Sequence, residues 1–176
     1  MNIWHDISPK RIKQEDFLAV IEIAKGSKTK YELDKETGIL RLDRVLYTST
    51  HYPANYGFIP RTYAADKDPL DVLVLCSEPI QPMTLVHCYP IGMISMMDNG
   101  FADDKIIAIP FEDPTYNSYQ DISEIPRHVF NEMSHFFQVY KSLERKQTAT
   151  DEIQDRAAAV RVIQESIDTY IELFCR

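Results

Sequence analysis

The sequence has no apolar run approaching the ~18 residues that a helix needs to cross a bilayer. Its first residues, MNIWHDISPKRIKQEDF, carry scattered charges and no apolar core segment, so neither a secretory signal nor a membrane anchor is expected. We therefore expect a soluble, cytoplasmic protein that has no membrane partner.

Cysteine and positive charge are both scarce. Cys76, Cys88 and Cys175 are too few and too widely spaced for a disulfide framework or a zinc site, which predicts reduced thiols. Lys and Arg number 19 against 27 Asp and Glu, a net charge of -8. Nucleic-acid-binding proteins usually carry a basic patch and a high pI, so nucleic acid is not an expected partner. Any phosphate compound that this protein binds should be small and accompanied by cations.

The chain is of the length and composition of one globular domain. Its 176 residues, 44% of them apolar, can bury a substantial core. No internal repeat, low-complexity tract or linker divides the sequence. We therefore expect a single domain over 1–176.

Short segments rich in Val, Ile, Leu and Tyr, bounded by turn residues, are predicted strands. They are 16–23, 28–33, 38–47, 71–76, 84–97 and 105–110. The turn formers and glycine of 34–38 (DKETG) predict a hairpin between the second and third.

From residue 121 onward, apolar residues recur at intervals of three or four, which predicts two amphipathic helices. They are Ile125, Val129, Met133, Phe136, Tyr140 and Leu143 in the first, and Ile153, Ala157, Val160, Ile163, Ile167, Ile171 and Phe174 in the second. Thr150 and Asp151 offer an N-cap for the second helix, and Glu152 would lie in its first turn. Strands followed by helices, without βαβ alternation, indicate an α+β fold with a mostly antiparallel sheet. Closure into a small barrel would hide the strand edges.

Residues 63–75 read YAADKDPLDVLVL and place Asp66, Asp68 and Asp71 just before a buried strand. Like charges this close repel unless water or a metal ion screens them. A calcium loop of the EF-hand type counted from Asp66 would need glycine and glutamate where Asp71 and Ser77 stand. A phosphatase-type aspartate nucleophile would be expected after a buried strand, not before it. Binding of a hard cation, magnesium or manganese, remains.

Other polar residues could complete such a site. Asp98, Asp103 and Asp104 also lie at predicted strand ends, although either acidic group alone is more often a solvated loop. Lys30 and Glu32 share one face of a strand, as in an ordinary charge pair. The remaining candidates are Arg44 on the next strand, Tyr52 and Tyr56, which could also be core residues, and the adjacent Tyr140 and Lys141 on the first helix.

The order and spacing of these motifs closely resemble those of the soluble family I inorganic pyrophosphatases, bacterial type. The resemblance runs from about residue 16 to 145 through AVIEI, KYELD, LDR, HYPANYGFIP, DKDPLDVLVL, the segment 98–105 and HFFQVYKSLE. HYPxNYGxIP together with DxDPxD is highly specific. The resemblance implies hydrolysis of pyrophosphate to two phosphates by a metal-activated water, on an OB-like barrel of about five strands flanked by helices.

The resemblance also implies a role for each matching residue, with three or four Mg²⁺ ions, or Mn²⁺ as a possible substitute. The implied metal ligands are Asp66, Asp71, Asp98 and Asp103, with Glu32 acting through water. Asp68 would be the general base. The implied substrate-binding residues are Lys30 and Tyr56 on the attacked phosphoryl group, and Arg44, Tyr140 and Lys141 on the leaving phosphate. Glu22, Tyr52 and Lys105 match other polar positions of the family's cavity.

Two departures from the family pattern lead to further expectations. Lys67 stands where the family usually has a small residue, commonly glycine. A left-handed backbone there would cost on the order of 1 kcal/mol for lysine, and its charge would weaken metal binding nearby. We favour the alternative, an ordinary backbone conformation with the side chain in solvent. Asn99 stands where the family usually has glutamate, which predicts weaker binding of the metals that arrive with substrate. Bacterial members form hexamers, and His135 and Val139 match positions of the interface. We therefore expect a homohexamer, with a trimer or a dimer as alternatives. The alternative to the enzyme is a non-catalytic barrel-type module that binds a divalent cation or a basic partner.

Overall fold

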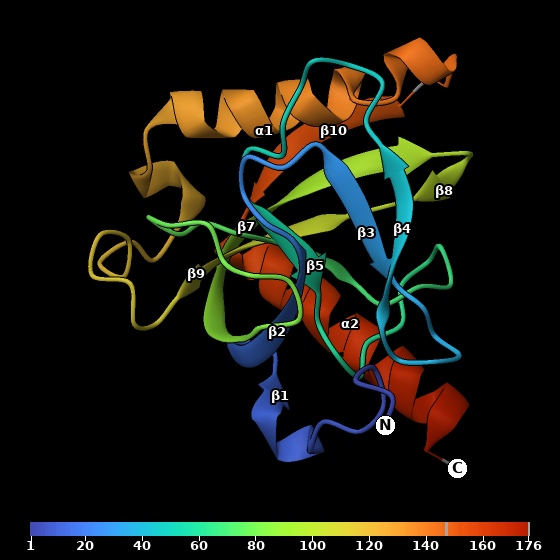
Figure 1. The fold of residues 1–176 in the computed structure, drawn as a ribbon. Helices are drawn as coiled ribbons and strands as arrows, with labels where there is room; N and C mark the ends of the chain where they lie inside the picture. Colours follow the sequence, from blue (N-terminus) through green and yellow to red (C-terminus); the bar gives the residue numbers. More distant parts are fainter. Residues whose placement is uncertain (147, 176) are drawn as a thin grey trace.

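A closed ring of five strands forms the centre of the protein. A computed structural model describes residues 1–146 and 148–175 (Figure 1). The ring runs β2 (Asp16–Ile23), β5 (Asn55–Phe58), β6 (Asp71–Val74), β9 (Lys105–Pro110) and β7 (Leu85–Asp98), and it closes because β7 also pairs with β2. Only the β6–β9 pair within this ring is parallel. The expected α+β fold with an OB-like barrel is therefore confirmed.

Five further strands extend or flank this ring. They are β1 (Ile12–Lys13), β8 (Phe101–Ala102) and β10 (Thr148–Asp155) on the same sheet, and β3 (Thr29–Leu33) with β4 (Leu40–Val45) as a separate hairpin. All six predicted strands are present, while β1, β5, β8 and β10 were not predicted. Strand β5 lies inside HYPANYGFIP and pairs with β2, and a Cβ at Gly57 would lie 1.8 Å from the Val20 carbonyl oxygen. Only glycine fits where two backbones approach so closely.

The expected hairpin at 34–38 joins β3 to β4. The Gly38 N–H donates to the Asp34 carbonyl oxygen at 2.8 Å, and the Thr37 N–H donates to the Asp34 carboxylate at 3.0 Å. Gly38 has φ +77°, a left-handed conformation that glycine adopts without steric cost. The hairpin (blue to cyan in Figure 1) stands beside the barrel and forms one wall of the site described below.

Within the described part of the chain, two α-helices cover the barrel, α1 (Arg127–Val139) and α2 (Arg156–Phe174), and there are three short 3₁₀ turns, η1 (Pro9–Arg11), η2 (Ile122–Glu124) and η3 (Ser142–Glu144). Helix α1 buries Met133, Phe136 and Phe137 in one part of the core, and α2 buries Ala159 and Ile163 in another. The apolar period therefore predicted that both helices exist, although not where each one ends.

The predicted start of the second helix is wrong. Residues 150 and 151 belong to β10, and the N-cap of α2 is Asp155, whose carboxylate accepts from the Ala158 N–H at 3.0 Å. Pairing with the long strand β7 holds residues 148–155 in extended form, a tertiary contact that local sequence does not reveal. The buried face of α2 is also rotated from the predicted stripe, because Ser166 and Tyr170 are buried while Ile171 is half exposed.

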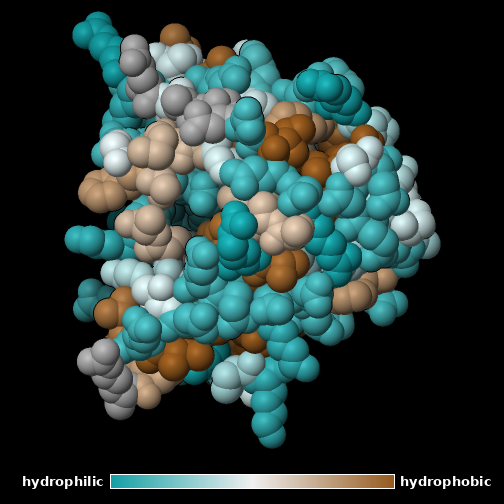
Figure 2. All heavy atoms as spheres, turned by 180° about the vertical axis from the view of Figure 1, so that it is seen from behind, coloured by the Kyte–Doolittle hydropathy of each residue, from teal (hydrophilic) through white to brown (hydrophobic). Residues whose placement is uncertain are grey.

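The surface carries hydrophobic residues in several places. On the face opposite to that of Figure 1, they form separate patches among hydrophilic residues (Figure 2). Over the surface as a whole, the exposed large hydrophobic side chains include Met97 and Phe101 near β8, and Leu173 and Phe174 at the end of α2. All three cysteines are free thiols, as expected. Within residues 1–146 and 148–175, no helix is both long and apolar enough to cross a membrane.

Candidate active site

A cavity of about 580 Å³ lies between the barrel, the β3–β4 hairpin and the C-terminal end of α1. Of the fifteen candidate residues named from the sequence, thirteen line it, and Arg44 and Asp104 do not. The thirteen are Glu22, Lys30, Glu32, Tyr52, Tyr56, Asp66, Asp68, Asp71, Asp98, Asp103, Lys105, Tyr140 and Lys141. Side chains from seven separate segments of the chain thus converge on one space.

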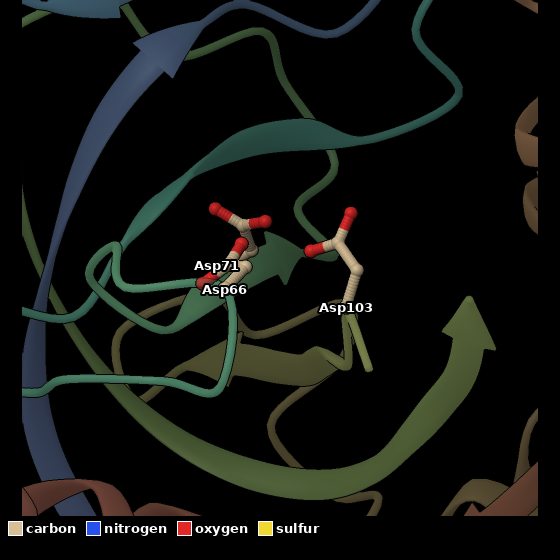
Figure 3. A group of neighbouring side chains, drawn as sticks. All are labelled: Asp66, Asp71 and Asp103. Carbon is tan, nitrogen blue, oxygen red and sulfur yellow. The ribbon is translucent and has the colours of Figure 1, made fainter. Parts of the chain in front are cut away.

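Three carboxylates form the centre of this cavity. Asp71 begins β6, Asp66 belongs to the preceding loop, and Asp103 lies between β8 and β9. One oxygen from each lies within 4.8 Å of the others, and Figure 3 shows the three carboxyl groups facing a common space. The Asp68 N–H donates to Asp66 Oδ1 at 3.1 Å, which fixes the loop that carries both residues.

Lys105 lies beneath these carboxylates and holds two of them. Parallel pairing of β6 with β9 places Lys105 directly beside Asp71. Its ammonium lies 2.5 Å from Asp71 Oδ2, 2.9 Å from Asp103 Oδ1 and 3.1 Å from the Tyr56 hydroxyl. The Lys105 side chain is only 3% exposed. Burial alone would lower the pKa of Lys105, but Asp71, Tyr56 and Asp103 outweigh it and raise that pKa well above its ordinary value.

Burial and mutual repulsion shift the pKa values of the carboxyl groups. Burial raises the pKa of Asp71 to about 6 despite Lys105, and the negative charge of Asp103 adds to the rise. The pKa of Asp66 is also raised, first by burial and then by Asp103 and Asp68. Burial acts in the same direction on Asp103, but contact with Lys105 lowers its pKa below the ordinary value. Lys105 therefore compensates only part of the negative charge, and a further cation would stabilise the cluster.

The second acidic group divides between two hollows. Asp98 at the end of β7 lines the cavity and accepts from the Lys141 ammonium at 2.5 Å. Asp104 lines a different hollow, on the other side of the 63–70 loop, beside Lys67 and Glu165 of α2. Lys141 and Tyr140 lie just beyond α1, not within it as predicted, because the helix ends at Val139. Their side chains nevertheless reach the cavity.

The hairpin contributes a connected group of charges. Lys30 Nζ lies 3.5 Å from Glu32 Oε1, as expected for residues on one strand face, and 3.4 Å from Asp43 Oδ2. Arg44 pairs with the same Asp43 carboxylate at 2.5 Å and with Glu144 of η3 at 2.9 Å. Among the described residues, the buried Arg44 Nη2 has no hydrogen-bond partner. A buried guanidinium N–H in this state is available to an anionic oxygen.

The remaining polar residues lie deeper. Glu22 on β2 accepts from the Leu33 N–H at 2.7 Å, and burial raises the pKa of its carboxyl group to about 8. Glu22 is therefore largely protonated at neutral pH. Burial also raises the pKa values of the Tyr52 and Tyr56 phenols well above the ordinary value, so both remain hydrogen-bond donors.

Lys35, Asp43 and Glu144 also belong to the site or support it, and the sequence did not single them out. Lys35 lines the cavity and pairs with Asp68, while Asp43 and Glu144 hold Arg44. Lys35 and Asp43 lie inside the DKETG and LDR motifs, but charged residues near a turn are usually solvated. Only the folded arrangement distinguishes them.

Lys67 and Asn99, the two residues that depart from the family pattern, both have a left-handed backbone conformation. Lys67 has φ +68°, so the expectation of an ordinary conformation is wrong. The tight loop from 64 to 68 requires this conformation, since the Lys67 N–H donates to the Ala64 carbonyl and the Ala64 N–H to the Asp68 carbonyl. Asn99 and Gly100 have φ +50° and +80° in the two-residue turn between β7 and β8. Asn-Gly is the preferred pair in such a turn, which gives a structural reason for asparagine here.

The balance of charge indicates what the cavity can hold. The lining includes nine carboxyl groups and five basic side chains among the described residues. Because the candidate ligands are all carboxylate oxygens, a hard divalent cation such as magnesium suits them better than a softer metal. The basic and phenolic groups, in turn, can bind a small anion beside those cations. The arrangement suits metal-assisted chemistry on a small phosphate compound.

Comparisons with known proteins agree with this geometry. The family model described as inorganic pyrophosphatase matches residues 19–171. The chain is 47% identical over 169 residues to soluble inorganic pyrophosphatase 1 of Arabidopsis thaliana, covering 96% of this chain and 80% of that protein. It is similar to the crystal structure of the inorganic pyrophosphatase of Thermus thermophilus, with a TM-score of 0.89 and 38% identity over 97% of this chain and 99% of the other. It is also similar to the inorganic pyrophosphatase of Helicobacter pylori, with a TM-score of 0.87 and 39% identity over 90% and 95% of the two chains.

Proposed function

Because this chain belongs to the inorganic pyrophosphatase family, we propose that it hydrolyses inorganic pyrophosphate to two orthophosphates, the reaction of an inorganic diphosphatase. The observation that carries the proposal is the convergence of three carboxylates, since one oxygen each of Asp66, Asp71 and Asp103 lies within 4.8 Å of the others. The cavity around them also contains Asp68 and several basic side chains. Pyrophosphate carries several negative charges, which must be neutralised before a nucleophile can approach.

The residues present fit a divalent metal cofactor. The carboxylate oxygens of the cluster are close enough to share one ion, and the raised pKa values of Asp66 and Asp71 reflect negative charge that Lys105 does not fully compensate. Asp66, Asp71, Asp98 and Asp103 would hold three or four Mg²⁺ ions, with Glu32 acting through water and Mn²⁺ as a possible substitute. Ions bound there would neutralise the substrate and lower the pKa of water from ~15.7 towards neutrality.

The protein's own residues then perform the proton transfer and hold the substrate. Asp68 accepts the proton of the attacking water, whose oxygen forms the new bond to phosphorus as the bridging P–O bond breaks. Lys30 and Tyr56 hold the attacked phosphoryl group. Tyr140 and Lys141 hold the leaving phosphate, and Arg44, which does not itself line the cavity, would join them through its unpartnered Nη2. Lys105 keeps Asp71 and Asp103 in place, while Glu22 and Tyr52 form the cavity's polar lining.

The organisation and assembly of the enzyme are also part of the proposal. One domain over 1–176 is supported by a single sheet that includes strands from both ends of the chain, β1 and β10. We propose a cytoplasmic homohexamer; the exposed position of His135 on α1, with Val139 half-buried, leaves His135 accessible to a second copy of the chain. Size-exclusion chromatography with light scattering, at two pH values, measures the assembly. A mass of one or two chains at both values would reject the hexamer.

The decisive experiment removes the proposed general base. Asp68→Asn should lower magnesium-dependent phosphate release from pyrophosphate by two to four orders of magnitude, the usual effect of general-base loss, on the order of 10²–10⁴. Asp104→Asn is the matched control, because Asp104 faces the other hollow, and its activity should stay close to wild type. Addition of a chelator should abolish the activity of all three proteins. A wild type without activity would instead favour a binding module, a reading that the family relationship does not support.

A further inference from the structure

The turn between β3 and β4 brings a lysine to the proposed general base. Lys35 Nζ forms an ion pair with Asp68 Oδ1, and both residues line the active-site cavity. The two side chains are about half exposed, 46% and 53%. The backbone N–H of Asp68 donates to Asp66, a proposed metal ligand on the same loop, and Lys35 lines the same cavity as the metal cluster. In the metal-free protein, a cation of the chain itself thus pairs with the carboxylate that must later accept a proton.

The N-terminal segment fixes this position of Lys35. The Asn2 side-chain amide donates to the Lys35 carbonyl oxygen at 2.7 Å, and the Lys35 ammonium lies 5.4 Å from the centre of the Trp4 ring. Trp4 is buried, and its indole N–H donates to the Thr62 carbonyl oxygen at 2.9 Å. The Thr62 hydroxyl in turn accepts from the Leu70 N–H at 2.9 Å, which joins the two ends of the loop that carries Asp68. The same framework therefore holds the ammonium and the carboxylate.

We propose that Lys35 is a positioning residue that pairs with Asp68 in the metal-free enzyme and opposes the entry of divalent cations into the adjacent cluster. This inference rests on the proposed function, because it takes Asp66 and its neighbours as metal ligands. A positive charge beside the cluster repels a divalent cation, while it attracts an anionic substrate. Lys35 therefore weakens metal binding in the absence of pyrophosphate and favours the joint binding of metal and pyrophosphate.

Magnesium binding to the metal-free protein, measured by titration calorimetry without pyrophosphate, tests this role. Lys35→Met should bind Mg²⁺ about two- to fivefold more tightly than wild type, the range expected for an exposed ion pair. Lys35→Arg keeps the charge and should bind as wild type does. Lys13→Met is the control, because Lys13 is exposed on β1 and outside the cavity lining. The difference should shrink between about 50 mM and about 500 mM KCl, because salt screens exposed charges.

Equal or weaker Mg²⁺ binding by Lys35→Met would overturn the inference, and so would a difference that does not depend on salt. Neither result would contradict the proposed function, because phosphate release from pyrophosphate, measured on the same preparations, tests that function separately. Failure of the wild type itself to bind Mg²⁺ would overturn the metal assignment, and the inference with it. Because Lys35 lies half exposed on a turn, its replacement should leave the thermal unfolding midpoint close to that of wild type, and this measurement accompanies the titration.

Discussion

Replacement of Lys105 by methionine tests how the carboxylate cluster is held together. Lys105 is almost fully buried, and its ammonium contacts Asp71, Asp103 and the Tyr56 hydroxyl within 3.1 Å. Methionine has a similar length and no charge, so it fills the space without restoring the contacts. Asp71 and Asp103 would then face each other in a poorly solvated place without a compensating cation.

The size of the effect follows from the burial of these groups. Breaking a buried ion pair by removing one partner costs about 3–5 kcal/mol, because the other charge remains desolvated. For a chain of this length, each kcal/mol lowers the unfolding midpoint by about 2–4 °C, so a fall of roughly 6–20 °C is expected. The loss of folding stability caused by Lys105→Met should be smaller at pH 5 than at pH 8. The pKa of Asp71 is already about 6 in the presence of Lys105, so acid allows this carboxyl group to become neutral.

Thermal unfolding of wild type and Lys105→Met, with a chelator and with magnesium, measures the effect. Magnesium should recover more stability in the variant than in wild type, because bound cations replace the missing ammonium. Lys13→Met, an exposed replacement of the same type, should leave the midpoint within about 1–2 °C of wild type. A variant as stable as wild type in chelator at pH 8 would refute the reasoning, since the two carboxylates would then need no internal cation.

Three further predictions concern single residues of the site. The folded pKa of Glu22, about 8, lies above its ordinary 4.5, so the free energy of unfolding should fall as the pH rises between these values, by on the order of 4–5 kcal/mol in total. Glu22→Gln should remove this slope in urea unfolding with chelator present, and an unchanged slope would contradict the assignment. Lys67→Gly should stabilise the protein by about 0.5–1 kcal/mol by relieving the left-handed backbone, measured by the same method; a destabilised variant would count against strain there. Asn99→Glu should shift the midpoint of the magnesium titration of activity to lower concentrations, and an unchanged midpoint would contradict this prediction. The variant should also lose about 1 kcal/mol of folding stability, because glutamate would have to adopt the positive φ of Asn99.

The elements that local pattern could predict are those with a clear period. The short Ile-, Leu- and Val-rich segments 16–23 and 105–110 located β2 and β9 to the residue, and the three-to-four spacing located α1 and α2 but not their ends. Strands β1 and β8 have two residues each and β5 only four, so they are too short for a period to be visible. Strand β10 is held in place by β7, a pairing between segments about fifty residues apart in the chain.

The candidate site was predicted through motifs, and the parts that were missed depend on tertiary contacts. Asp66, Asp68 and Asp71 lie within six positions, so their shared location was visible in the sequence. Glu144 ends the HFFQVYKSLE motif, but it contacts Arg44 of a distant strand only through the fold, so the sequence did not indicate this partner. The left-handed backbone of Lys67 was misjudged because lysine rarely adopts it, and only the closed loop around it makes the conformation necessary.

The position of Trp4 has a practical consequence. It is the sole tryptophan of the sequence, and it lies under the hairpin turn while its indole N–H is bonded to the start of the acidic loop. Its nearly parallel neighbour is Tyr63, the next residue of that loop, at 6.4 Å between ring centres. The tryptophan fluorescence of the unlabelled protein, excited selectively above the tyrosine absorption, therefore arises from one indole beside the two segments that enclose the cavity, and optical titrations can follow both without an introduced dye.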